Sequence, residues 1–193
     1  MNICVYGAAS NIIDSSFVKA GEQVGEIIAK RGHKLVFGGG ANGMMGAAAR
    51  GMTANGGYII GIVPKFLNAD GVIYDKCDEL HFTDDMRSRK LLLEDMSDAF
   101  LITAGGLGTF DELFEILTLK QLGRDKKAIA ILNTNGYYDD IINMLNHCVK
   151  EKFMFEKSLE LFKVFDDATE AIEYIENYKG ELASIKEMKS IKI

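Results

Sequence analysis

The sequence predicts an α/β fold in which a doubly wound, Rossmann-like parallel sheet is covered by helices on both faces. Short apolar segments alternate along the chain with segments of helical periodicity. Segments such as Ile129–Leu132 are apolar at every position, which is typical of strands buried on both sides. Glycines directly follow several of these segments, as is usual where a strand turns into a helix. Together these observations favour a single doubly wound domain.

Seven strands are expected, with helical patterns between nearly all of them. They are Asn2–Tyr6, Lys34–Phe37, Tyr58–Val63, Glu79–Phe82, Ala99–Thr103, Ala128–Leu132 and Phe162–Phe165. In an open parallel sheet, a ligand lies in the crevice at the carboxyl ends of the strands. Gly7, Gly38–Gly40 and Gly105–Gly108 all fall at that edge. We therefore expect the binding site there.

The most informative segment runs from the strand Ala99–Thr103 through Gly105, Gly106 and Gly108 into a helix. Three glycines in four positions let the backbone approach a ligand closely. The N–H groups of this turn and of the first helical turn can then hold a phosphate at the positive end of the helix dipole. A purely structural interpretation competes with this one, because Thr109 and Glu112 also fit a capping box.

A second glycine-rich turn follows the strand Lys34–Phe37 and weakens the purely structural interpretation. It contains Gly38–Gly40, Gly43 and Gly46 and leads into a helix of small residues. Two such turns at one sheet edge predict a crevice lined by backbone N–H groups. Neither turn matches a Walker loop or a dinucleotide fingerprint, which disfavours kinase and dehydrogenase functions.

A third segment, residues 83–90, predicts a helix start with Thr83 as its cap and three cations close together. Arg87 and Lys90 fit a solvated helix face as well as they fit a binding role. Arg89 is the stronger candidate, because its helix can pack near the carboxyl end of the strand Ala99–Thr103. Glu115 lies three residues after Glu112 and so shares its helix face.

Composition and charge limit the possible functions further. A chain of 193 residues with 48% hydrophobic content can bury the core of one domain. We predict a nucleotide-binding α/β domain over residues 1–179 and a tail or short helix over residues 180–193. The net charge of −6 argues against a nucleic-acid polymer as partner. The apolar stretches have only strand length, so we expect a cytoplasmic protein without a membrane span.

The three cysteines give no sign of a metal centre. Cys4, Cys77 and Cys148 lie far apart and show no spacing typical of metal ligands. We therefore expect reduced thiols, no metal and no cofactor.

Three motifs in order resemble the Lonely Guy family of cytokinin nucleotide phosphoribohydrolases, long mislabelled as lysine decarboxylases. They are Gly38-Gly39-Gly40-x-x-Gly43-Met44-Met45-Gly46, Met86-x-x-Arg89-Lys90 and Gly105-Gly106-x-Gly108-Thr109-x-x-Glu112. The similarity runs from the first strand to about Val149. Two positions depart from the family pattern: Ala104 replaces a proline, and Arg87 replaces a histidine near the base. The first departure affects the rigidity of the turn, and the second affects base preference.

The resemblance implies hydrolysis of the N-glycosidic bond of a purine nucleoside 5′-monophosphate, whose base is adenine or N6-substituted adenine. Arg89 and Glu112 are the expected catalytic residues, because an oxocarbenium-like ribosyl cation needs a nearby anion and water needs a proton acceptor. Arg89 is expected to orient Glu112 and keep it ionised. The expected substrate-binding residues are Gly7, Ala8, Gly39, Gly40, Gly43, Met86, Lys90, Gly105, Gly106, Gly108, Thr109 and Glu115.

The main alternative is a non-catalytic carrier or sensor that binds a nucleotide or the molybdenum cofactor on a similar sheet. Arg89 and Glu112 argue against it, because a binding protein has no need of a carboxylate close to a phosphate. The resemblance also implies a homodimer, whose interface is expected on the apolar helix faces around Leu91–Met96 and Leu113–Leu122.

Overall fold

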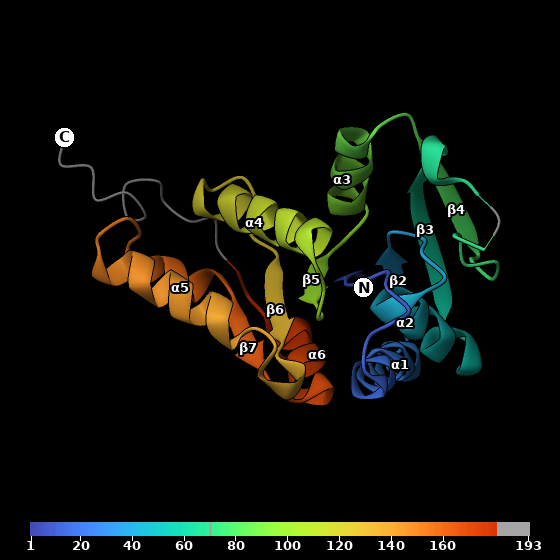
Figure 1. The fold of residues 1–193 in the computed structure, drawn as a ribbon, viewed down its shortest axis with the longest axis horizontal. Helices are drawn as coiled ribbons and strands as arrows, with labels where there is room; N and C mark the ends of the chain where they lie inside the picture. The colour runs from blue at the N-terminus through green and yellow to red at the C-terminus, as the bar shows by residue number, and fades with distance from the viewer. Residues whose placement is uncertain (70, 181–193) are drawn as a thin grey trace.

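A computed structural model shows one seven-stranded sheet with helices on both faces (Figure 1), as predicted. The structure describes residues 1–69 and 71–180. All strand pairs are parallel, and the strand order is β4-β3-β2-β1-β5-β6-β7. The predicted tail or final helix over residues 180–193 lies almost entirely outside the described residues, and its boundary stays a prediction.

The predicted strands are all present, and most differ from the prediction by one residue at an end. The observed strands are β1 (Asn2–Tyr6), β2 (Lys34–Phe37), β3 (Tyr58–Pro64), β4 (Glu79–Thr83), β5 (Ala99–Ile102), β6 (Ala128–Leu132) and β7 (Lys163–Phe165). The α-helices are α1 (Ser15–Lys30), α2 (Gly43–Ala54), α3 (Met86–Asp95), α4 (Leu107–Gln121), α5 (Asp139–Lys150) and α6 (Ala168–Asn177). Short 3-10 helices are η1 (Lys65–Leu67), η2 (Thr134–Gly136) and η3 (Glu156–Leu161).

Successive residues of each central strand belong to two different cores. Ile3 and Val5 of β1 pack with α1, α2 and α6, whereas Cys4 and Tyr6 pack with α3 and α4. Because both faces are covered, the positions of β1 after Asn2 are all buried, which explains why the sequence shows no polar alternation there. In the part of the chain that the structure describes, no helix combines the length and the apolar character needed to cross a membrane.

The starts of two helices differ from the sequence prediction. Helix α4 begins at Leu107, with Gly106 at the cap position and no side-chain cap. Thr109 therefore lies inside the first turn, and the capping-box interpretation of Thr109 and Glu112 is wrong. Helix α3 is capped by Asp85, whose carboxylate accepts a hydrogen bond from the N–H of Ser88 at 2.8 Å, and not by Thr83. At α3 the backbone geometry selected Asp85 over the nearby Thr83, and at α4 it placed a glycine at the cap position in front of Thr109.

Candidate active site

The carboxyl edge of the sheet holds a central pocket of about 350 Å³ between the β1–α1 loop and the start of α4. It brings together residues from segments far apart in the sequence. These are Gly7, Ala8, Ala9, Ser10, Met45, Arg89, Gly106, Gly108, Thr109 and Glu112. The two expected catalytic residues and five of the expected substrate-binding residues therefore share one cavity.

The floor of the central pocket is the first turn of α4. The first N–H groups of a helix have no acceptor within the helix, and here no side chain caps them. A Cβ atom built on Gly106 or Gly108 would meet no other atom within 4 Å, so both positions face open space. Gly105 differs, because a Cβ there would lie 2.1 Å from Oγ1 of the buried Thr109. This turn therefore offers unshielded N–H donors to an anion.

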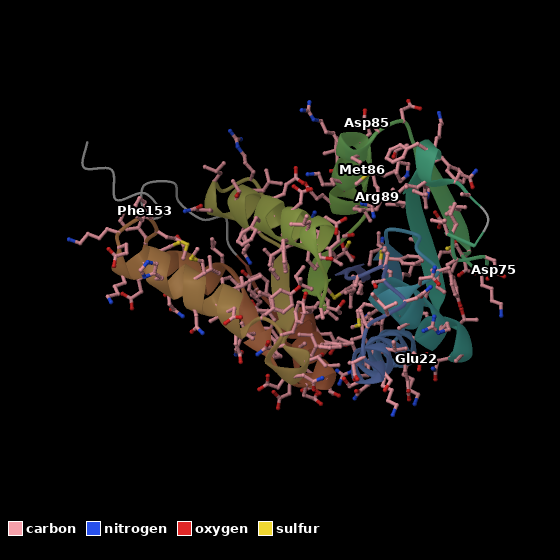
Figure 2. All side chains as sticks on the ribbon, viewed as in Figure 1. Glu22, Asp75, Asp85, Met86, Arg89 and Phe153 are labelled. Carbon is pink, nitrogen blue, oxygen red and sulfur yellow. The ribbon has the colours of Figure 1, made fainter. Side chains whose placement is uncertain are left out.

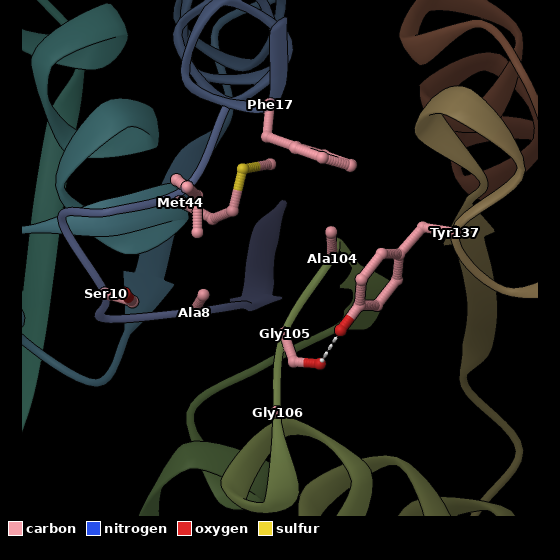
Figure 3. Close-up of a pocket in the computed structure, with 9 residues that line it drawn as sticks. Ala8, Ser10, Phe17, Met44, Ala104, Gly105, Gly106 and Tyr137 are labelled. Atoms are coloured by element: carbon pink, nitrogen blue, oxygen red, sulfur yellow. Dashed lines mark hydrogen bonds between the residues drawn. The ribbon is translucent and has the colours of Figure 1, made fainter. Parts of the chain in front are cut away.

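Three consecutive carbonyl groups fix the turn from behind. Tyr138 donates its hydroxyl hydrogen bond to the carbonyl of Thr103 at 2.8 Å, and Tyr137 donates to that of Gly105 at 2.6 Å (Figure 3). Between them, the N–H of Ala8 donates to the carbonyl of Ala104 at 3.0 Å. The two tyrosines were not among the residues predicted from the sequence. The available signal was their position just beyond the next strand, β6, at the same sheet edge.

Arg89 and Glu112 form a buried ion pair above this floor. Nη1 of Arg89 lies 2.9 Å from Oε1 of Glu112, and the two residues are only 7% and 8% exposed. Arg89 projects from α3 (Figure 2) and also donates from Nε to the carbonyl of Ile62 at 3.2 Å. Its Nη2 occupies the space beside Gly38, where a Cβ atom would come within 1.9 Å. The guanidinium is thus held by β3, the β2 turn and α4 at once.

The pKa of Glu112 lies above its ordinary value, because burial outweighs the opposing effect of Arg89. Arg89 lowers this pKa, as expected, but burial raises it more, so the expectation that Arg89 keeps Glu112 ionised stays a prediction. A carboxyl group with a raised pKa next to an open helix N-terminus is suited to exchanging a proton with a substrate or water.

The second glycine-rich turn forms one wall of a neighbouring pocket of about 300 Å³, here called the glycine-turn pocket. Its lining is Ala9, Gly38, Gly39, Gly40, Asn42, Met45, Val63, Leu67, Val72, Ile73 and Arg89. Two backbone groups of this turn are engaged within the protein. Ala41 donates to the carbonyl of Val72 at 2.9 Å, and Gly39 accepts from the N–H of Tyr74 at 2.8 Å. The N–H of Ala41 is therefore not available to a ligand, and binding of an anion by the remaining N–H groups of this turn stays a prediction.

A third cavity, here called the outer pocket, lies on the other side of the α4 turn and measures about 230 Å³ (Figure 3). It is lined by Ala8, Ser10, Ile13, Phe17, Met44, Ala104, Gly105, Gly106 and Tyr137. Gly105 was expected to contact substrate, and the structure places it here.

Four other expected substrate-binding residues do not line these three pockets. The side chain of Lys90 reaches from α3 to α4, where its Nζ lies 3.0 Å from Asp111 and 2.7 Å from Glu115. Met86 is the first residue of α3 and is 39% exposed. Gly43 starts α2 with a φ of 61°, and a Cβ there would lie 2.4 Å from the carbonyl oxygen of Ala8. Contacts of these residues with a substrate stay predictions.

Within the residues that the structure describes, no cluster of three or more histidine, cysteine or acidic residues could hold a metal ion.

The fold and this edge define a parallel α/β protein with an open helix N-terminus beside a buried Arg–Glu pair. The family model described as possible lysine decarboxylase matches residues 45–175, and the chain belongs to this family. Its curated relatives are Lonely Guy proteins, which confirms the resemblance seen in the three motifs.

Two plant relatives illustrate the similarity. The rice protein named cytokinin riboside 5′-monophosphate phosphoribohydrolase LOG is 32% identical over 179 residues, which cover 93% of this chain and 74% of the relative. The Arabidopsis thaliana protein of the same name, LOG3, is 33% identical over 176 residues, covering 91% of this chain and 82% of the relative.

Solved structures share the fold at lower identity. The molybdenum cofactor binding protein of Rippkaea orientalis superposes with a TM-score of 0.70 at 23% identity, covering 91% of this chain and 94% of that one. The Moco carrier protein of Chlamydomonas reinhardtii gives a TM-score of 0.68 at 23% identity, covering the same shares of the two chains. At this identity the likeness shows the fold alone.

Proposed function

We propose that this protein hydrolyses the N-glycosidic bond of purine nucleoside 5′-monophosphates, with adenine or N6-substituted adenine as the base. The observation that carries the proposal is the buried Arg89–Glu112 pair, which lines the same pocket as the open first turn of α4. The names of the curated relatives support this reaction. A lysine decarboxylase activity is disfavoured, because the sequence offers no lysine in a context for a pyridoxal Schiff base.

In this proposal the 5′-phosphate binds the first turn of α4. The N–H groups of Gly106, Gly108 and Thr109 supply the donors, and the helix dipole favours the negative charge. The ribose then lies in the central pocket against the β1–α1 loop. Gly7 lines this pocket, and its lack of a Cβ makes room for Oγ1 of Thr103, which a Cβ atom would approach to 2.2 Å.

Glu112 carries the chemistry in two ways. Its carboxylate stabilises the positive charge that develops on the ribose as the bond from C1′ to the base breaks. It also accepts a proton from the water whose oxygen forms the new bond to C1′. The leaving base takes up a proton from solvent at its ring nitrogen, and Glu112 then returns its proton to solvent, which regenerates the carboxylate. The products are the free base and ribose 5-phosphate. Arg89 holds Glu112 in place through the 2.9 Å contact.

The base extends toward the glycine-turn pocket. Arg89, Ala9 and Met45 line both this pocket and the central one, so a nucleotide can pass across them. Gly39 and Gly40 then wall the base. We propose three further substrate contacts, which are Met86 and Lys90 on α3 and Glu115 on α4.

A carrier or sensor is the second candidate, because two structural neighbours are a molybdenum cofactor binding protein and a Moco carrier protein. The desolvated carboxylate of Glu112 beside an anion site argues against it, because charge repulsion there weakens binding of a phosphate and serves a binding protein no purpose.

The decisive experiment measures base release by the purified protein from AMP, N6-prenyl AMP, GMP and CMP, with adenosine for comparison. Because the phosphate is held by donors that have no other evident ligand, we expect kcat/KM for adenosine to be about a hundredfold lower than for AMP. Binding of AMP without base release would favour the carrier, and equal rates for AMP and adenosine would contradict the phosphate site.

We also propose that the protein is a homodimer with its interface near the active site. The structure narrows the expected surface, because Leu113, Ile116 and Leu117 of α4 are already buried against the sheet. Leu91 and Phe114 remain 58% and 43% exposed and are the residues left for an interface. Light scattering should give twice the mass of the chain at micromolar concentration, and a monomer there would contradict the proposal.

A further inference from the structure

The proposed function uses the central and glycine-turn pockets and leaves the outer pocket without a role. The outer pocket is the cavity between α1, α2 and the segment after β6, and Figure 3 shows Phe17, Met44 and Tyr137 around it. It lies at the carboxyl edge of the adjacent strands β1 and β5, the edge at which open parallel sheets bind ligands.

The outer pocket adjoins the phosphate site directly. Ala8, Ser10 and Gly106 line both the outer and the central pocket. Gly106 stands at the cap position of α4, where the proposed phosphate binds. A phosphate held there therefore lies between the two pockets. If its ribose ester extends into the central pocket, a second ester group extends into the outer one.

The lining of the outer pocket indicates what such a group would be. It has the side chains of Ile13, Phe17, Met44 and Tyr137 and no charged side chain. The Tyr137 hydroxyl is engaged with the Gly105 carbonyl, so this residue presents its ring to the cavity. The Phe17 and Tyr137 rings meet edge to face with centroids 5.7 Å apart. This lining suits a flat, uncharged ring and disfavours a second phosphate.

The volume of the outer pocket also favours a single ring. A volume of about 230 Å³ is below the range of pockets that hold drug-sized ligands, so the cavity suits one ring system and not a whole nucleotide.

We infer that the outer pocket is a subsite for a ring carried on the second ester oxygen of the 5′-phosphate. The substrate class then includes nucleoside 5′-phosphodiesters as well as monophosphates. This inference rests on the proposed function, and the reaction is unchanged: water adds to C1′, the base leaves, and the ring stays on the ribose phosphate.

The test compares two diesters of equal charge, the phenyl and the methyl ester of AMP, with AMP itself. We expect kcat/KM for the phenyl ester to exceed that for the methyl ester by about tenfold, since burying the ring on apolar side chains favours binding. The Ile13→Trp variant fills the outer pocket and should reduce this ratio to about one. The matched control is Ile12→Trp, because Ile12 is 95% exposed and does not line the pocket, and it should keep the wild-type ratio.

Each result separates the subsite from the proposed function. A phenyl ester no better than the methyl ester, in a protein that cleaves AMP, overturns the subsite alone. An equal loss for AMP and the phenyl ester in Ile13→Trp shows that the outer pocket holds the nucleotide itself, which also overturns it. Without AMP cleavage, the proposed function fails, and calorimetric binding of the two esters still tests the ring preference. If Ile13→Trp does not fold, Phe17→Leu should lower the phenyl-to-methyl ratio.

Discussion

The glycine-rich turns after β2 and β5 look alike in sequence and serve different purposes in the structure. At the β5 turn, Cβ atoms on Gly106 and Gly108 would meet nothing within 4 Å. At the β2 turn, a Cβ on Gly38 would strike Arg89 at 1.9 Å, and one on Gly46 would strike the carbonyl oxygen of Ala41 at 1.9 Å. One turn therefore keeps space open for a ligand, whereas the other makes room for the protein itself.

The surroundings of the two turns explain the difference. The segment that follows η1 covers the β2 turn and forms an antiparallel bridge between Gly40 and Ile73. In the part of the chain that the structure describes, no such bridge covers the β5 turn, and its carbonyls are held from behind by Tyr137 and Tyr138. A run of glycines thus indicates close approach of atoms, and the fold decides whether those atoms belong to a ligand.

The largest expected effect tests whether the β5 turn serves a catalytic residue. Glu112→Gln keeps the size of the side chain but removes the charge that stabilises the ribosyl cation and the acceptor for the proton of water. We expect turnover of AMP to fall by roughly two to four orders of magnitude, while AMP binding persists or tightens. Base-release kinetics and calorimetric titration of the same protein give the two values.

The neighbouring carboxylate supplies the control for this variant. Asp111 precedes Glu112 on α4, but it is exposed and pairs with Lys90 at 3.0 Å. Asp111→Asn should therefore change turnover by less than about threefold, as expected for a surface pair. Turnover of Glu112→Gln within about threefold of wild type would instead support the binding-protein hypothesis.

A glycine-to-alanine substitution in each of the two turns tests directly whether the missing side chain makes room for a ligand or for the protein. Gly108→Ala places a methyl group in the proposed phosphate site without touching protein atoms, so we expect the KM for AMP to rise about tenfold with an unchanged or slightly higher Tm. Gly46→Ala forces a methyl group against backbone, and we expect a loss of about 3 kcal/mol in the free energy of unfolding, or roughly 6 to 12 °C in Tm.

Steady-state kinetics and thermal unfolding of both variants check this pair of expectations. The proposed difference between the two turns is wrong if Gly108→Ala loses stability while keeping its KM, or if Gly46→Ala unfolds like the wild type.

The smallest expected effect concerns the tyrosines behind the β5 turn. Tyr138→Phe removes the donor to the buried Thr103 carbonyl, and we expect the KM for AMP to rise severalfold with little change in kcat, at a cost of roughly 1 to 2 kcal/mol in stability. The matched control lies by the other turn: the Tyr74 hydroxyl is 2.7 Å from Oγ1 of Thr53. Tyr74→Phe should lose similar stability without a change in KM, and equal KM values for both variants would contradict a positioning role.

The sequence by itself determined the sheet, because burial on both faces requires strands that are apolar throughout, and such segments are visible without coordinates. It also indicated Arg89 and Glu112, since their residue types and motif spacing stand out in an otherwise ordinary pattern. Their 2.9 Å contact agrees with that reading, and their catalytic roles stay predictions.

Only the tertiary structure decided where α4 begins, which glycine turn is open, and that Tyr137 and Tyr138 hold the open one. A helix start depends on backbone angles that several nearby polar residues could satisfy, so Thr109 resembled a cap although Gly106 occupies that position. The tyrosines act on carbonyls more than 30 residues away along the chain. Such contacts arise only when β5 and β6 lie side by side, and no local pattern of residues records that proximity.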